Sequence, residues 1–318
     1  MSEWPEGPAI CYSGYRRGQS PESRVYPSLD EIREDLLLLS PHWRLLRLYD
    51  CSPHAERVLQ VIREDGLALR VLLGAHLGAE TSNPRCPWGG LYSDAQLAAQ
   101  RSANDAEVER LIALARRHED IVFAVAVGNE ATVDWSDHLV PVPRLIECVR
   151  RVRSALRQPV TVCENYVPWR RHLRPLADEL DFISLHTYPV WEYKTIDEAL
   201  AYSQENYASV AGLYPDKRVV ITEAGWPTAS NGRGMNAADA TPQLQARHYR
   251  ELVAWTDAAA IPCFVFEAFD EEWKGSADAL EPEKHWGLFT AGRAPKLVLQ
   301  EAEPGQGEEA GRSPPGTA

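Results

Sequence analysis

The sequence predicts an α/β fold consisting of a single (β/α)8 TIM barrel, and three observations support this prediction. Short apolar or β-branched runs alternate with amphipathic helical stretches along most of the chain, a pattern typical of βα units around a parallel sheet. There are eight such runs, the number that closes a (β/α)8 barrel. An open doubly wound sheet, the competing fold, usually has a glycine-rich phosphate turn after its first strand, and the segment Ser13-Gly14-Tyr15 is not that motif.

The predicted strands are short and rich in Val, Ile, Leu, Ala and Cys, as expected for strands buried on both faces of a parallel sheet. In chain order they cover residues 9–15, 45–51, 68–76, 121–130, 159–166, 180–188, 218–226 and 262–270. Amphipathic patterns between them predict helices over residues 28–39, 55–65, 104–118, 143–156, 196–213 and 241–258, with Ser28 as the N-cap of the first.

Two segments do not fit the βα alternation. Residues 77–103, after the third predicted strand, are rich in turn residues, and we expect a long loop there that overhangs the functional site. Residues 301–318 are rich in Pro, Gly and Glu without apolar periodicity, which predicts a disordered tail. The expected organisation is therefore one catalytic barrel over residues 1–300, followed by this tail.

Composition and charge limit the classes of partner. The chain has 318 residues, of which 44% are hydrophobic, enough for a large core. Its formal net charge of −13 disfavours nucleic acid and anionic membrane surfaces as partners. No apolar run approaches the ~18 residues of a spanning helix, and the N-terminus lacks the pattern of a secretion signal. We therefore expect a cytoplasmic protein without an obligate protein partner, and keep periplasmic and extracellular locations open.

Acidic residues gather where the predicted strands end, which is where barrel enzymes build their active sites. They are Asp50, Glu130, Glu164, Glu223, Glu267, Asp270 and Glu271. Tryptophans follow the same strand ends: Trp88, Trp135, Trp169, Trp191, Trp226, Trp273 and Trp286. Some of these will pack loops onto the barrel, but flat indole faces beside carboxylates suit the apolar faces of sugar rings. This combination predicts a neutral sugar polymer as the substrate.

Two strand ends carry the most specific signals. The fourth run ends in Asn129 and Glu130, and the seventh ends in Glu223 followed by Gly225 and Trp226. Retaining glycoside hydrolysis requires one protonated and one ionised carboxyl group roughly 5–5.5 Å apart, and strands on opposite sides of a narrow barrel can supply this pair. An Asn directly before the acid can hydrogen-bond the 2-hydroxyl of the sugar.

Four motifs in chain order resemble those of glycoside hydrolase family 17, the β-1,3-glucanase family within the retaining (β/α)8 clan. They are VGNE at 127–130, ITEAGWPT at 221–228, FEAFDEEWKG at 266–275 and EKHWGLF at 283–289. The resemblance extends from about residue 10 to 295. It implies the retaining barrel of clan A and hydrolysis of β-1,3-linked glucan through a covalent glycosyl-enzyme intermediate, without a cofactor or metal.

The resemblance also assigns expected roles to individual residues. It implies that Glu130 is the general acid and base, that Glu223 is the nucleophile, and that Asn129 binds the 2-hydroxyl. It further implies that Tyr188 hydrogen-bonds the nucleophile and that other residues line the cleft or support it: Glu271, Lys274, Glu283 and Trp286.

The chain departs from the plant-type members of the family in its first, fifth and sixth predicted strands, and is closer to the bacterial branch. Some members of that branch resemble glucanosyltransferases, which pass the glucan to another sugar. Such transfer by the same two carboxylates is therefore the alternative function, with Trp191, Trp226 and Trp286 as candidate platforms for the acceptor.

Two rival functions stay open. A metal-dependent barrel enzyme could use the carboxylates as Mg²⁺ ligands, although no HxH or HxxxH spacing groups the histidines, and His186 is expected to be a hydrogen-bonded rim residue. A barrel that binds glucan without catalysis is the second rival. Six cysteines without a CxxC pair favour reduced, structural thiols over disulfides or a zinc site.

Overall fold

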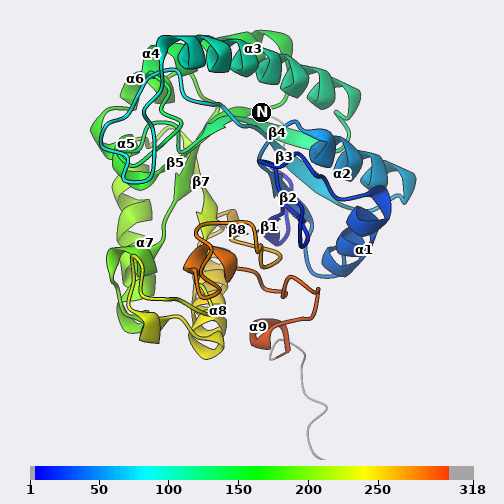
Figure 1. Cartoon of the computed structure of the whole chain (residues 1–318), viewed down its shortest axis with the longest axis vertical. Helices are drawn as coiled ribbons and strands as arrows, with labels where there is room; N and C mark the ends of the chain where they lie inside the picture. Colours follow the sequence, from blue (N-terminus) through cyan, green and yellow to red (C-terminus); the bar gives the residue numbers. More distant parts are fainter. Residues whose placement is uncertain (1–3, 301–318) are drawn as a thin grey trace, which may run out of the picture.

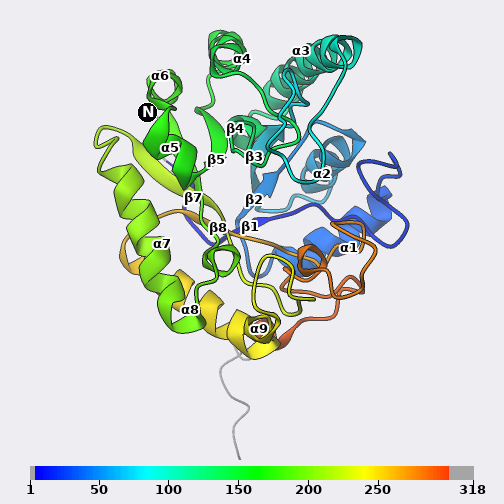
Figure 2. The same ribbon diagram turned by 60° about the vertical axis from the view of Figure 1, so that its left-hand side comes forward.

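The computed structural model describes residues 4–300, in which eight parallel strands close a barrel in the order β1 to β8. Helices surround the strands, and both follow the chain around the ring (Figures 1 and 2). The predicted (β/α)8 barrel is confirmed. The expected disorder of residues 301–318 lies outside the described residues.

All eight strands fall within the predicted apolar runs. They are β1 (Ala9–Cys11), β2 (Leu45–Leu48), β3 (Arg70–Ala75), β4 (Val122–Asn129), β5 (Val160–Asn165), β6 (Phe182–His186), β7 (Arg218–Ala224) and β8 (Cys263–Val265). All eight are shorter than predicted, mainly because the last residues of each run leave the sheet and enter the loops at the C-terminal end of the barrel. These last residues carry most of the polar side chains discussed below.

The main helices are α1 (Leu29–Leu39), α2 (Pro53–Glu64), α3 (Asp94–Arg117), α4 (Val142–Ala155), α7 (Ile196–Ala211) and α8 (Pro242–Ala258). Shorter helical segments are α5 (Tyr166–Arg171), α6 (Arg174–Ala177), α9 (Leu297–Gln300), η1 (Pro189–Glu192), η2 (Ala237–Asp239) and η3 (Pro282–Lys284). Side-chain caps define several starts. Ser28 and Glu31 form a capping box at α1, as the predicted N-cap requires.

The structure differs from the prediction in two places. Helix α3 begins at Asp94, so the expected loop over residues 77–103 is shorter by about one third. The first turns of α3 are mostly exposed and lack apolar periodicity, and the helix is started instead by a capping box of Ser93 and Gln96. Between β5 and β6, two short helices, α5 and α6, occupy a segment for which no helix was predicted.

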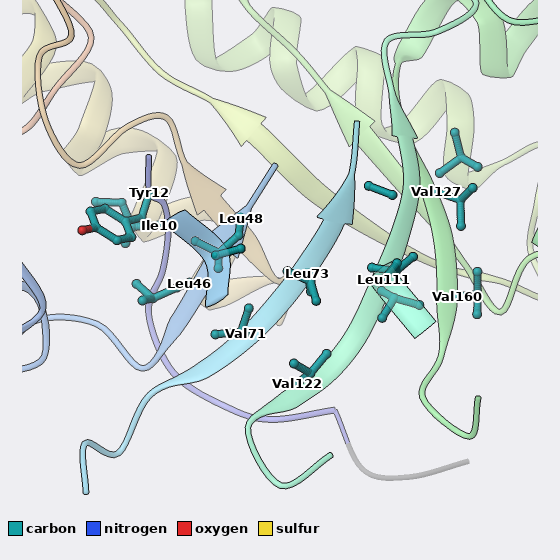
Figure 3. Close-up of a cluster of buried hydrophobic side chains, with 14 of the residues drawn as sticks. Ile10, Tyr12, Leu46, Leu48, Val71, Leu73, Leu111, Val122, Val127 and Val160 are labelled. Atoms are coloured by element: carbon teal, nitrogen blue, oxygen red, sulfur yellow. The ribbon is translucent and has the colours of Figure 1, made fainter. Parts of the chain in front are cut away.

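Alternate residues of the strands build two separate cores. Side chains on the outer face of the sheet, such as Leu46, Leu73 and Val122, pack toward the helices together with Leu111 of α3 (Figure 3). Side chains on the inner face fill the lower part of the barrel. There Trp4 contacts Phe123 and Phe182 edge to face, with ring centroids 5.2 and 4.9 Å apart. Phe123 and Phe182 lie at the starts of β4 and β6, so these aromatic rings pack inside the N-terminal end of the barrel.

Within residues 4–300, no helix combines the length and apolarity that crossing a membrane requires. All six cysteines carry free thiols, and five of them are buried. This agrees with the structural role predicted for them.

Candidate active site

A cavity of about 990 Å³ lies over the C-terminal ends of the strands. Its lining combines carboxylates, histidines and aromatic rings, with residues from the segments that follow all eight strands. Of the ten residues predicted for the site, eight line it: Asn129, Glu130, Tyr188, Trp191, Glu223, Lys274, Glu283 and Trp286. Trp226 and Glu271 do not.

The two predicted catalytic carboxylates meet across the barrel. Glu130 follows the last residue of β4, and Glu223 belongs to β7. One oxygen of each carboxylate and Nδ1 of His186 lie within 4.8 Å of one another. This spacing matches the roughly 5–5.5 Å of a retaining glycosidase better than the roughly 6.5–9.5 Å of an inverting one.

Glu223 is held as a carboxylate by two cations and a hydroxyl group. Arg47 of β2 forms a buried salt bridge with Oε1, and Tyr188 donates a hydrogen bond of 2.6 Å to Oε2. Nδ1 of His186 lies 3.4 Å from Oε2. Burial alone would raise the pKa of Glu223, but the charges of His186 and Arg47 outweigh it and lower the pKa to about 2. Glu223 is therefore ionised throughout the physiological pH range.

His186 lies between the two carboxylates. Its Nδ1 is 2.9 Å from Oε1 of Glu130, and its side chain is fully buried. Burial lowers the pKa of His186, but the charge of Glu223 and hydrogen bonds to Cys163 and Glu130 raise it to about 10. An imidazolium therefore separates the two carboxylates at neutral pH.

The same three residues form the group with the spacing of a metal site. A metal ion would need Nδ1 of His186 without its proton, whereas the surrounding carboxylates favour the protonated form. Arg47 already neutralises Glu223. Glu130, His186 and Glu223 are therefore better suited to keep a proton on His186 than to bind a metal ion.

Lys274 connects a second group of acids to the cavity. Its Nζ lies 2.7 Å from Glu267 and 2.7 Å from Glu271. Glu271 is only 1% exposed and also accepts hydrogen bonds from Ser13 and Trp273. Glu271 therefore does not bind substrate in the cleft, and that prediction is corrected; its carboxylate is enclosed by these three partners and has the supporting role that was also expected.

The remaining acids predicted at strand ends have mostly structural positions. Asp50 lines the cavity, whereas Glu164, Glu267 and Asp270 do not. Glu164 accepts hydrogen bonds from the backbone N–H and the hydroxyl group of Thr132, at 2.8 and 2.6 Å. Its carboxylate thereby ties the β5 end to the loop after β4.

An aromatic cluster forms one part of the cavity wall. Trp286 contacts Tyr188, Phe266 and Trp191, with ring centroids 5.2, 5.8 and 5.8 Å apart. Trp226 does not join this surface, and its predicted role as a platform is corrected. Its indole is buried, and Nε1 donates a hydrogen bond of 2.6 Å to the carbonyl of Asp239. Trp226 therefore packs loops together.

Two loops, residues 76–93 after β3 and residues 130–141 after β4, form another part of the wall, which we call the paired wall. Trp88 and Trp135 belong to it, line the cavity and are 60% and 36% exposed. The buried amide of Asn83 donates to the carbonyls of Asp134 and Ser136, at 2.9 and 2.8 Å. These hydrogen bonds hold the two loops together, so both indoles are presented on a fixed support.

Arg47 is a site residue that the sequence analysis missed. It is 2% exposed, and its guanidinium binds both Glu223 and Asn129. The available signal was a single charge within the apolar run that forms β2. A charged residue is rarely buried without a partner, so this Arg could have been assigned to the acidic strand ends.

Comparisons with known proteins place these observations in context. Residues 9–287 match the family described as the BtgE/BtgC glycoside hydrolase domain. A glucan 1,3-beta-glucosidase of Arthroderma benhamiae is 28% identical over 208 residues, which cover 60% of this chain and 66% of that protein. The chain spans 40 to 66% of the length of this relative and of two further curated relatives, from Schizosaccharomyces pombe and Aspergillus clavatus.

Solved structures are similar over most of the barrel. An endo-laminarinase from Formosa Hel1_33_131 aligns with a TM-score of 0.79 and 27% identity, covering 92% of this chain and 86% of that one. A beta-1,3-glucanosyltransferase from Rhizomucor miehei aligns with a TM-score of 0.72 and 21% identity, covering 92% and 96%. The second similarity supports the fold alone.

Proposed function

Because the chain belongs to the BtgE/BtgC glycoside hydrolase domain family, we propose that it cleaves β-1,3-linked glucan with retention of configuration. The membership agrees with the resemblance to glycoside hydrolase family 17 found in the sequence. The observation that carries the proposal is the short distance between the carboxylates of Glu130 and Glu223, within 4.8 Å. Carboxyl groups this close are expected of a retaining enzyme, because an inverting enzyme separates them further to admit a water molecule.

In the first step, the ionised Glu223 attacks the anomeric carbon. The bond from this carbon to the glycosidic oxygen breaks, and Glu130 gives its proton to that oxygen as the leaving sugar departs with the bonding electrons. We assign the acid role to Glu130, because its side chain is 24% exposed to the cavity, whereas the 7% exposed Glu223 is held ionised by Arg47 and His186. The product is a glycosyl ester of Glu223.

In the second step, Glu130 acts as the base. It takes a proton from an incoming hydroxyl group, whose oxygen attacks the anomeric carbon, and Glu223 leaves as a carboxylate. Arg47 and His186 stabilise that carboxylate, so they favour its departure. Asn129, which Arg47 holds in place, is the proposed partner of the 2-hydroxyl.

The lining of the cavity supports a neutral glucan chain as the substrate. Trp88 and Trp135 of the paired wall, and the partly exposed Trp191 that packs on the buried Trp286, offer flat apolar surfaces to pyranose rings. Arg233, a cation on the lining, is already neutralised by Glu281. The names of the relatives and of the endo-laminarinase point to a 1,3-linked β-glucan among such chains.

Hydrolysis, the function proposed here, and transfer differ in the molecule that attacks the glycosyl-enzyme: water in hydrolysis and a sugar hydroxyl group in transfer. We suggest incubating the purified protein with reduced and unreduced laminari-oligosaccharides of defined length and analysing the products by chromatography and mass spectrometry. Shorter products alone would support hydrolysis, and their sizes distinguish endo from exo cleavage. Products longer than the substrate would identify the glucanosyltransferase alternative.

A variant tests whether the proposed nucleophile carries the reaction. Glu223→Gln should abolish turnover, because no covalent intermediate can form, while binding of laminari-oligosaccharides measured by calorimetry persists. Turnover at the wild-type rate would contradict the assignment.

The cytoplasmic location expected from the sequence stays a prediction, which fractionation of the producing cells would test.

A further inference from the structure

The backbone at Glu130 has an unusual conformation. Glu130 has φ +46°, in the left-handed region that non-glycine residues seldom adopt, and Gly128 two residues before has φ +91°. A non-glycine residue is strained in this region, so surrounding contacts must hold it there. The register between β4 and β5 also shifts between Ala126 and Asn129. The proposed acid and base is thus placed by an irregular strand end.

Two contacts hold the peptide group that joins Asn129 to Glu130. Its N–H, which belongs to Glu130, donates to the carbonyl of Cys163 on β5 at 2.9 Å. Its carbonyl, which belongs to Asn129, lies 2.8 Å from Nε2 of His138. Both polar atoms of this peptide plane are therefore fixed, one by the neighbouring strand and one by a side chain of the paired wall.

The protonation state of His138 follows from its partners. Nε2 faces a backbone carbonyl, and Nδ1 lies 2.7 Å from a carboxylate oxygen of Asp137. A carbonyl and an ionised carboxylate only accept hydrogen bonds, so both ring nitrogens donate and the ring is an imidazolium. Burial would lower the pKa of His138, but the hydrogen bonds to Asp137 and Asn129 outweigh it and raise the pKa.

The surroundings of His138 support this arrangement. The charged and titratable groups that face it are Asp137 on its own loop, Glu130 at the end of β4, and His76 after β3, whose ring centroid is 5.1 Å away. The carbonyl of Asp137 accepts a hydrogen bond of 2.8 Å from the hydroxyl group of Tyr92. The paired wall therefore anchors the imidazolium from both of its loops.

We propose that His138, clamped by Asp137, is a positioning residue that holds the Asn129–Glu130 peptide so that the carboxyl group of Glu130 faces Glu223. The proposal rests on the proposed function, since it concerns proton transfer by Glu130. It predicts that the loss of His138 damages only the steps in which Glu130 gives or takes a proton. A residue needed only for folding would instead affect all substrates equally.

The test compares His138→Leu with His138→Gln, whose amide can still donate to the carbonyl of Asn129. The substrates are a laminari-oligosaccharide and a dinitrophenyl β-glucoside, whose leaving group needs no proton. For His138→Leu, kcat/KM on the oligosaccharide should fall about 10- to 100-fold, as expected for a misplaced catalytic group, while kcat/KM on the dinitrophenyl glucoside stays within about twofold of wild type. His138→Gln should recover most of the loss.

Azide provides a second readout. It attacks the anomeric carbon of the glycosyl-enzyme without giving up a proton, the bond to Glu223 breaks, and the carboxylate leaves with the bonding electrons. Azide should therefore raise kcat of His138→Leu on the dinitrophenyl glucoside and yield a β-glucosyl azide. The same two effects are expected for a Glu130→Ala variant. Asp137→Asn, which keeps the side-chain shape, should show the same pattern in a weaker form.

The outcomes distinguish the possibilities. Equal losses on both substrates in His138→Leu and Asp137→Asn, or no loss on either substrate, would overturn the positioning role. If the wild-type protein cleaves the dinitrophenyl glucoside but no β-1,3-glucan, the proposed substrate is wrong. The role of His138 can then still be tested by the effect of azide. His42→Gln, at an exposed histidine of the opposite barrel end, serves as the control and should match wild type.

Discussion

The charge of His186 should determine the pH range over which Glu223 works, and His186→Asn tests this. Nδ1 of His186 lies 3.4 Å from Oε2 of Glu223. At this distance Coulomb's law gives about 1 kcal/mol in bulk water and about 5 kcal/mol at an effective dielectric constant of ~20. With about 1.4 kcal/mol per pKa unit, these limits correspond to roughly 1 to 3.5 units.

The sign follows from the charges. The imidazolium stabilises the carboxylate, so its removal raises the pKa of Glu223 from about 2. Since Arg47 remains, we expect a rise of about 1–3 units, typical for the loss of one opposite charge. The wild-type protein should therefore show no acid limb in kcat/KM above about pH 3, whereas His186→Asn should show one between about pH 3 and 5.

The assay uses a dinitrophenyl β-glucoside between pH 2.5 and 7, because its departure needs no proton from Glu130 and the acid limb then reports Glu223. Samples preincubated at each pH and assayed at pH 6 separate titration from acid inactivation. Tyr188→Phe, which removes a neutral hydrogen bond of 2.6 Å to the same carboxylate, should shift the limb less. A flat profile in His186→Asn down to pH 3 would refute the electrostatic reasoning.

Four further predictions follow from the site and the core. Glu130→Ala should lose about 10²–10⁴-fold in kcat/KM on laminari-oligosaccharides and little in kcat/KM on a dinitrophenyl glucoside; equal losses of kcat/KM on both substrates would contradict its acid role. Trp88→Ala should raise KM for long laminari-oligosaccharides and leave KM for the short aryl glucoside unchanged. Leu91→Ala is the control, because Leu91 is exposed on the same loop but does not line the cavity. Equal KM values in the two variants would show that Trp88 does not bind substrate. Asp35→Asn should destabilise the fold by about 3–5 kcal/mol in urea unfolding, because the fully buried carboxylate pairs with two arginines, whereas the exposed Asp30→Asn should change stability by less than about 0.5 kcal/mol. EDTA should leave kcat unchanged, because the nitrogen shared by the two catalytic carboxylates holds a proton; a loss reversed by added Zn²⁺ or Mg²⁺ would revive the metal-dependent alternative.

The barrel could be predicted because each strand is a compact apolar run and a periodic helix separates all consecutive runs except the fifth and sixth. Local signals also located the start of α1, where Ser28 caps the helix. The start of α3 was missed because its first turns make few core contacts, so periodicity says nothing about them. The capping box at Ser93 and Gln96 was the remaining local signal.

The site was predictable to the extent that single residues carry local signatures. Glu130 and Glu223 stand in recognisable motifs at strand ends. Arg47 is 176 residues from Glu223 in sequence, and only closure of the barrel brings the two together. Trp226 and Trp286 both follow strands and are both buried, but only Trp286 borders the cavity, because the side on which an indole packs depends on tertiary contacts.

The hydrogen bonds within the paired wall also bear on how this barrel can change. Asn83 of one loop satisfies two carbonyls of the other, and Tyr92 satisfies a third. A loop transplanted from a homologue without its companion would leave buried polar atoms without partners, which is costly. Residues 76–93 and 130–141 should therefore be replaced together. We expect chimeric barrels to fold well when both segments come from the same homologue.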